Sequence, residues 1–179
     1  MPEPDGSYAN GDTVEVVVEI PRGSQNKYEY DFQRNAVRLD RVLYSSVHYP
    51  ADYGFIEGTL ADDGDHLDAL VLIEHPTFPG CLVEGRPVAV LQMEDDNGED
   101  QKILCACARD LRQDDIVSLE SVPAHVLTEI ENFFEIYKTL EGRETRLRGW
   151  RGCAEALDLI RQAQEAYRRA GHEQGARPG

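Results

Sequence analysis

The sequence predicts an α+β domain in which a small closed β-barrel carries two C-terminal helices on its outside. The first two thirds of the chain contain short segments of alternating polarity, separated by turn signals, which is the pattern of strands. The last third changes to the residue spacing of amphipathic helices. Strands followed by helices indicate an α+β domain, and several short strands favour a closed barrel.

The clearest predicted strand covers residues 14–20, where every second residue is valine or isoleucine. In residues 27–32 the rings of Tyr28, Tyr30 and Phe32 alternate with charged side chains. Further strands are predicted at 36–43, 67–73, 86–93 and 101–107. Turn signals separate them: PRGSQN, the region from Pro50 to Gly54, HPTFPG and DDNGED.

Two helices are predicted in the last third. The first begins near Pro123, a residue that suits a first helical turn, and its apolar residues keep helical spacing as far as Tyr137. Gly142 follows its end. The second helix is predicted from about Cys153 to Ala170.

The length of 179 residues suits a single domain. With 41% hydrophobic and 29% charged residues, the chain is globular rather than disordered in composition. We place one domain at residues 12–171 and expect loose ends at 1–11 and 172–179.

The formal net charge of −16 argues against nucleic acid and anionic membranes as partners. No apolar run approaches the ~20 residues of a membrane span. The start, MPEPDGSYANGD, has neither the basic nor the apolar part of a secretory signal, so we expect a cytoplasmic protein. An acidic chain fits either a cation binder or an ordinary solvated surface, and charge alone favours the second.

The four cysteines form no CxxC pair, which argues against a zinc or redox motif. Cys105 and Cys107 stand two apart in an apolar run and would share one face of a strand. We expect reduced, buried thiols.

The segment DDGDHLDALVL, residues 62–72, brings Asp63, Asp65 and Asp68 within six residues. Carboxylates held this close repel one another, and a hard divalent cation removes the penalty. Mg²⁺ takes oxygen ligands and keeps several waters, so a few carboxylates suffice. A solvated acidic turn explains this segment equally well by itself, whereas an EF-hand lacks its 12-residue spacing.

A second acidic cluster lies between two predicted strands, and Lys102 follows it. Its members are Glu94, Asp95, Asp96, Glu99 and Asp100. Taken alone, this cluster is best interpreted as a charged hairpin loop.

Several basic and phenolic residues accompany the acids. Lys27 and Glu29 share one strand face, and Arg41 stands between apolar neighbours, where a charge is costly unless it is paired. Tyr137 alone reads as a core aromatic, and Lys138 as a cation at a helix end.

These groups together suit pyrophosphate, a compact polyanion that needs cations around both phosphoryl groups. Its hydrolysis requires a nucleophile in line with the bridging oxygen and neutralisation of the leaving phosphate. Two neighbouring metals can do both, and carboxylates can hold those metals and take the proton.

From about Val14 to Trp150 the chain resembles the soluble family I inorganic pyrophosphatases of bacterial type. The matching pieces, in the family's order, are EIP (19–21), KYE (27–29), LDR (39–41), YPADYGFI (49–56), DGDHLD (63–68), RPVAVLQM (86–93), the loop 95–102, FFEIYK (133–138) and GW (149–150).

The resemblance implies a five-stranded, OB-like closed barrel and a homohexamer. It also implies an inorganic diphosphatase, which splits pyrophosphate into two phosphates by in-line attack of a metal-activated water. Several Mg²⁺ ions per site are implied, with Mn²⁺ or Zn²⁺ as substitutes.

Residue by residue, the resemblance implies direct metal ligands at Asp63, Asp65, Asp68, Asp95 and Asp100. Glu19 and Glu29 would line the metal site, mostly through waters. Phosphate oxygens would be held by Lys27, Arg41, Tyr53, Lys102, Tyr137 and Lys138. Asp65 is the implied proton acceptor, with Asp100 as the competing candidate.

The chain departs from the family pattern at His66, where proline is usual, and at Asp96, where glutamate is frequent. Without the fixed backbone angle of proline, the loop from Asp65 to Asp68 should be more mobile. Side chains alternate along an extended segment, so we expect His66 to face outward rather than to bind a metal.

Two other functions remain as alternatives. A non-catalytic relative would have lost a ligand or a cation, whereas every such position is filled here. A hydrolase of nucleotides or of another diphosphate compound would need a base-stacking motif or a P-loop, and none is visible.

Overall fold

The computed structural model describes residues 13–175. Its strands are β1 (Val14–Ile20), β2 (Asn26–Asp31), β3 (Ala36–Val42), β4 (Asp52–Ile56), β5 (Asp68–Leu72), β6 (Leu82–Asp95), β7 (Gly98–Cys107) and β8 (Arg146–Arg151). The helices are α1 (Ala124–Ile136) and α2 (Cys153–Gly175), with three short 3-10 turns at Leu111–Gln113, Leu119–Ser121 and Thr139–Glu141. The predicted loose end 1–11, and the residues from 176 on, lie outside the described residues, while α2 continues past its predicted end at Ala170.

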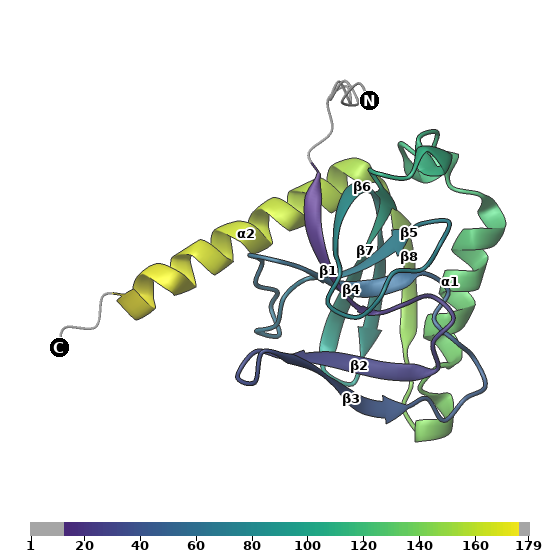
Figure 1. The fold of residues 1–179 in the computed structure, drawn as a ribbon, viewed down its shortest axis with the longest axis horizontal. Helices are drawn as coiled ribbons and strands as arrows, with labels where there is room; N and C mark the ends of the chain where they lie inside the picture. The colour runs from purple at the N-terminus through teal and green to yellow at the C-terminus, as the bar shows by residue number, and fades with distance from the viewer. Residues whose placement is uncertain (1–12, 176–179) are drawn as a thin grey trace.

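The α+β class is confirmed as a mixed sheet with two helices (Figure 1). The main sheet has the strand order β1-β4-β5-β7-β6-β8, and β1 pairs with β6 as well as with β4. Only β5 and β7 run parallel among these pairs. Strands β2 and β3 form a separate antiparallel hairpin that lies beside the main sheet.

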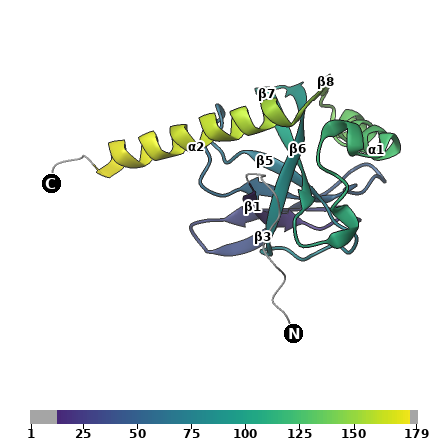
Figure 2. The same cartoon turned by 90° about the horizontal axis from the view of Figure 1, so that it is seen from above.

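The two helices lie against opposite faces of the sheet. Leu104 and Ala106 of β7 belong to a hydrophobic cluster with α1, whereas Ile103 and Cys105 belong to a cluster with α2. Figure 2 shows α2 crossing the sheet and projecting beyond it, with α1 at the other end of the molecule. Because Cys105 and Cys107 are buried in the same cluster, their prediction as buried residues on one strand face is confirmed.

The prediction of a turn from Pro50 to Gly54 is wrong, because Asp52–Ile56 forms strand β4. All five residues of β4 are buried, so the strand lacks the alternation that marks a half-exposed one. Gly54 serves a close approach of backbones: a Cβ atom there would lie 1.9 Å from the carbonyl oxygen of Val17. A glycine that looks like a turn signal is therefore a packing requirement.

Strand β8 was not predicted either, and β6 is longer than the predicted 86–93. Strand β8 pairs only with β6 at the sheet edge, and its register shifts near Gly149, whose φ is 89°. Its three arginines make the segment resemble a polar loop in the sequence. Strand β6 passes through Pro87, where a register shift towards Ala89 accommodates the missing N–H.

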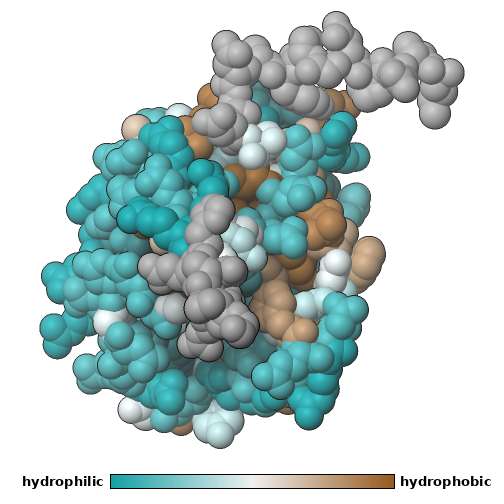
Figure 3. Space-filling view, turned by 90° about the vertical axis from the view of Figure 1, so that its left-hand side faces the viewer, coloured by the Kyte–Doolittle hydropathy of each residue, from teal (hydrophilic) through white to brown (hydrophobic). Residues whose placement is uncertain are grey.

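The face shown in Figure 3 is largely hydrophilic, with hydrophobic areas between the polar ones. No helix in the described part of the chain is long and apolar enough to cross a membrane.

Candidate active site

One cavity of about 890 Å³ opens between the β2–β3 hairpin, the acidic loop before β5, the β6–β7 turn and the end of α1. Every residue that the sequence analysis assigned to the site lines this cavity: Glu19, Lys27, Glu29, Arg41, Tyr53, Asp63, Asp65, Asp68, Asp95, Asp100, Lys102, Tyr137 and Lys138. The fold thus brings together segments that are far apart in sequence, although it assigns no role to any of them.

Lys102 lies at the centre of the carboxylates. Its Nζ atom is 2.5 Å from Oδ2 of Asp68 and 2.5 Å from Oδ1 of Asp100, and it donates to the hydroxyl of Tyr53 at 3.1 Å. The parallel pairing of β5 with β7 sets Asp68 opposite Lys102, which explains the first contact. Burial alone would lower the pKa of Lys102, but attraction by Asp68 and Asp100 raises it, so its ammonium group stays charged.

Three carboxylates of the cavity hold their protons unusually tightly. Burial raises the pKa of Glu19 to about 7, and burial also raises the pKa of Asp100. The pKa of Asp65 is raised by burial and by repulsion from Asp63 and Asp68. The free-energy cost of ionising these carboxylates falls when a cation lies beside them, so they are suited to binding a cation.

Two other lysines of the cavity, Lys138 and Lys27, are already paired with carboxylates. Nζ of Lys138 lies 3.0 Å from Oδ2 of Asp95. Burial alone would raise the pKa of Asp95, but the hydrogen bond from the backbone N–H of Asn97 and the contact with Lys138 lower it. Lys27 forms an ion pair with Glu29 and lies 3.5 Å from Asp40.

Arg41 is paired, as its charge requires. Its Nε and Nη2 atoms each lie 2.9 Å from one oxygen of Glu141, and Nη1 lies 2.6 Å from Asp40. Sequence reasoning missed both partners. Asp40 could have been found as the neighbour of Arg41 within the LDR piece, whereas Glu141 lies a hundred residues away and gives no such signal.

Tyr137 is both a core aromatic residue and part of the cavity wall. Its ring is buried against Phe133 and Phe134, at centroid distances of 5.1 and 5.5 Å, yet the residue also lines the cavity. The ammonium of Lys138 lies 5.2 Å from the centroid of this ring. A core ring can therefore present its hydroxyl edge to the site.

The acidic loop is held by its own hydrogen bonds. The N–H of Asp65 donates to Oδ1 of Asp63 at 3.0 Å, and its carbonyl accepts from the N–H of Ala61 at 2.8 Å. Gly64 takes a φ of 91°, which favours glycine at this position. The predicted mobility of the loop is not tested by these contacts and stays a prediction.

His66 does not face outward as the sequence predicts. Its ring is half-buried and stacks on Phe55, with centroids 4.9 Å and planes 14° apart. Its Nδ1 atom lies 2.7 Å from the carbonyl oxygen of Thr59, so Nδ1 carries the hydrogen. The prediction from side-chain alternation is wrong here because Phe55, a buried ring on β4, packs against the imidazole.

The cavity fits a hydrated divalent cation better than a closed metal cage. Within residues 13–175 no three Asp, Glu, His or Cys side chains converge into a preformed metal site. The nearby donors are carboxylate oxygens, which suit Mg²⁺. Since Mg²⁺ is usually held by one or two carboxylates, waters and substrate phosphates, separated carboxylates are an adequate donor set.

Comparison with known proteins identifies the family. The family model described as inorganic pyrophosphatase matches residues 16–168. The chain belongs to the inorganic pyrophosphatase family. The matched range contains every residue of the predicted site.

Relatives and solved structures agree with this membership. The chain is 53% identical over 152 residues to the inorganic pyrophosphatase of Methanosarcina acetivorans, covering 85% of this chain and 90% of that protein. It is 48% identical to the inorganic pyrophosphatase of Synechocystis, covering 87% of this chain and 92% of that one. The crystal structure of inorganic pyrophosphatase from Thermus thermophilus superposes with a TM-score of 0.86 at 46% identity, over 93% of this chain and 97% of that one.

Proposed function

We propose that the chain hydrolyses inorganic pyrophosphate to two phosphates by in-line attack of a water molecule. The observation that carries this proposal is the cavity in which five cationic side chains stand among carboxylates: Lys27, Arg41, Lys102, Lys138 and Arg143. Pyrophosphate needs cations around both phosphoryl groups, and hydrolysis needs acceptors for protons and metals.

Divalent metal is the proposed cofactor, with Mg²⁺ favoured over Mn²⁺ or Zn²⁺. When bound, the metal lowers the pKa of the attacking water and neutralises phosphate charge. The proposed direct ligands are Asp63, Asp65, Asp68, Asp95 and Asp100, with Glu19 and Glu29 acting through waters. The all-oxygen donor set and the raised pKa values of Glu19, Asp65 and Asp100 support this choice.

The proposed substrate contacts are Lys27, Arg41, Lys102 and Lys138, together with the hydroxyls of Tyr53 and Tyr137. Each of these cations now has a carboxylate partner. Once cations neutralise those carboxylates, the ammonium and guanidinium groups are available to phosphate oxygens. The site therefore favours joint binding of metal and pyrophosphate over either alone.

Asp65 is the proposed proton acceptor. Asp100 is the less suitable candidate because the ammonium of Lys102 already lies 2.5 Å from its Oδ1 atom. Asp65 lines the cavity, and burial together with repulsion from Asp63 and Asp68 raises its pKa, which brings its basicity closer to that of a useful general base.

Phosphate release from pyrophosphate and from ATP, each with Mg²⁺, Ca²⁺ or EDTA, tests the proposal. We expect turnover of pyrophosphate with Mg²⁺, background in EDTA and little turnover with Ca²⁺, whose loose geometry of 6–8 ligands disfavours strict in-line positioning. Turnover in EDTA comparable to that in Mg²⁺ would contradict a metal-dependent reaction. Faster turnover of ATP than of pyrophosphate would favour a nucleotide hydrolase.

We further propose that β1, β4, β5, β7 and β6 form the five-stranded, OB-like closed barrel. The pairing of β1 with both β4 and β6 supports closure. We also propose a cytoplasmic homohexamer. Buried thiols at Cys105 and Cys107 suit a reducing compartment, and exposed apolar side chains such as Tyr44, Phe78 and Leu82 suit contacts between copies. Light scattering during gel filtration measures the oligomer.

A further inference from the structure

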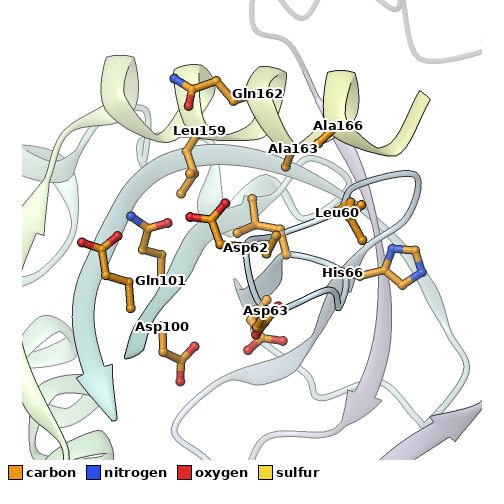
Figure 4. Close-up of a pocket in the computed structure, with 14 residues that line it drawn as sticks. Leu60, Asp62, Asp63, His66, Asp100, Gln101, Leu159, Gln162, Ala163 and Ala166 are labelled. Carbon is orange, nitrogen blue, oxygen red and sulfur yellow. The ribbon is translucent and has the colours of Figure 1, made fainter. Parts of the chain in front are cut away.

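A second, smaller cavity of about 240 Å³ separates the acidic loop from helix α2. It shares Asp63, His66, Asp68, Glu99 and Asp100 with the main cavity, and its other wall is formed by Leu159, Gln162, Ala163 and Ala166 of α2. Figure 4 shows α2 running directly over the loop, with Asp63 and Asp100 on the far side of the cavity. Helix α2 thus faces three of the proposed metal ligands across this cavity.

Helix α2 touches the loop segment at two points. The backbone N–H of Leu60 donates to the carbonyl of Ala163 at 2.9 Å. Six residues further along the chain, the ring of His66 lies 5.8 Å from that of Tyr167, centroid to centroid. The two contacts hold both ends of the segment that carries Asp63 and Asp65.

His66 is the best anchored residue of this segment. It stacks on Phe55 of β4, lies 5.3 Å from the ring of Phe32 at the hairpin tip, and bonds to the carbonyl of Thr59. The N–H of the next residue, Leu67, donates to Oγ1 of Thr59 at 2.9 Å. Since His66 follows Asp65 directly, a shift of its ring moves the backbone that aims the Asp65 carboxylate.

We propose that His66 and Tyr167 are positioning residues through which helix α2 sets the magnesium affinity of the acidic loop. His66 also lines the main cavity, but its Nδ1–H group donates to the carbonyl of Thr59 and its ring stacks on Phe55, so its assigned role is to hold the loop rather than to bind the cation or the substrate. The two residues hold the loop in its binding arrangement before the cation arrives, so that less ordering free energy opposes binding. Tyr167 acts on the loop through the His66 ring, which is its contact with the segment. The inference rests on the proposed metal-dependent pyrophosphatase function.

Calorimetric titration of Mg²⁺ into the chain without pyrophosphate tests this coupling. A contact between rings is worth enough to change a linked affinity by about two- to tenfold. We expect His66→Ala and Tyr167→Ala each to raise the magnesium Kd by such a factor. Arg168→Ala changes a neighbouring exposed residue of α2 and should leave Kd unchanged. Because no pyrophosphate is present, a failure of catalysis cannot be mistaken for a failure of this coupling.

A double variant and a ring-preserving variant distinguish this coupling from a merely structural role. The double variant His66→Ala/Tyr167→Ala should bind Mg²⁺ no more weakly than His66→Ala alone, because Tyr167 acts through the ring that is already gone. His66→Phe keeps the ring contacts and should bind more tightly than His66→Ala. Amide hydrogen exchange of residues 63–68 should speed up in His66→Ala and Tyr167→Ala. A lowered Tm with unchanged magnesium Kd in both single variants would overturn the proposal, as would strictly additive effects.

Discussion

Glu141 holds Arg41 with both carboxylate oxygens, at 2.9 Å from Nε and 2.9 Å from Nη2 of the guanidinium. This two-oxygen geometry is also the one in which a guanidinium binds phosphate. Glu141 therefore occupies the face of Arg41 that pyrophosphate would use, and it must give way or share that face when substrate binds.

We predict that Glu141→Gln lowers the KM for pyrophosphate by about two- to fivefold. The reason is that loss of one ion pair of this partly exposed kind frees about 0.5–1 kcal/mol for the competing phosphate. Steady-state kinetics at saturating Mg²⁺ measures the effect, and Glu135→Gln on an exposed position of α1 is the control. A raised KM would mean that Glu141 instead holds Arg41 in its substrate-binding position.

Asp65→Asn and Asp100→Asn should each reduce kcat strongly, on the order of 10²–10⁴-fold where general-base catalysis is lost. Both changes keep side-chain size, so the fold should survive, as circular dichroism can check. Asp62→Asn is the matched control, because Asp62 is an exposed residue of the same loop that lines only the smaller cavity. If Asp65→Asn retains near-normal kcat across pH, Asp100 takes the role of base.

Tyr53→Phe and Tyr137→Phe should impair kcat/KM more than stability. Each variant loses a hydroxyl whose hydrogen bond to a charged phosphate oxygen is worth roughly 1.5–3 kcal/mol. Tyr49→Phe tests the competing view of a purely structural role, since Tyr49 packs 4.7 Å from Phe133 in the same aromatic cluster but does not line the cavity. Kinetics like those of the parent enzyme with a lowered Tm for Tyr137→Phe would make Tyr137 a core residue only.

Glu19 should make the metal-free protein less stable at alkaline pH. Its pKa in the folded state, about 7, lies above the reference value of 4.5, so folding favours the protonated form. The stabilisation is complete below pH 4.5 and disappears as the pH rises through 7. Glu19→Gln keeps an acceptor for the N–H of Tyr30, which bonds to Oε1 at 2.7 Å.

In EDTA we therefore expect Glu19→Gln to gain roughly 1–3 kcal/mol of unfolding free energy at pH 8 relative to the parent chain, and little at pH 4.5. Urea unfolding at the two pH values measures the difference. Glu15→Gln, on an exposed position of the same strand, serves as the control. An equal gain at both pH values would show that the effect has no connection with proton binding.

Local patterns in the sequence predicted most of the secondary structure. Alternation predicted β1 with its correct bounds, because one face of that strand packs into the core and the other is only partly covered. Helical spacing predicted α1 and α2, since each helix buries one stripe of apolar residues against the sheet. Strand β4 was not predicted because it is buried on both faces. Strand β8 was not predicted because its arginines, which an edge strand can expose, are also typical of a loop.

The candidate site residues could be named from the sequence because they lie in short segments with a recognisable family order. What only the tertiary structure decided is which groups meet. Lys102 meets Asp68 through the parallel pairing of β5 with β7, and Glu141 reaches Arg41 across a hundred residues. His66 packs on Phe55 because β4 presents a buried ring beside the loop. Sequence patterns record the environment of a residue along its own segment, whereas partners from other segments are determined by the packing of the whole chain.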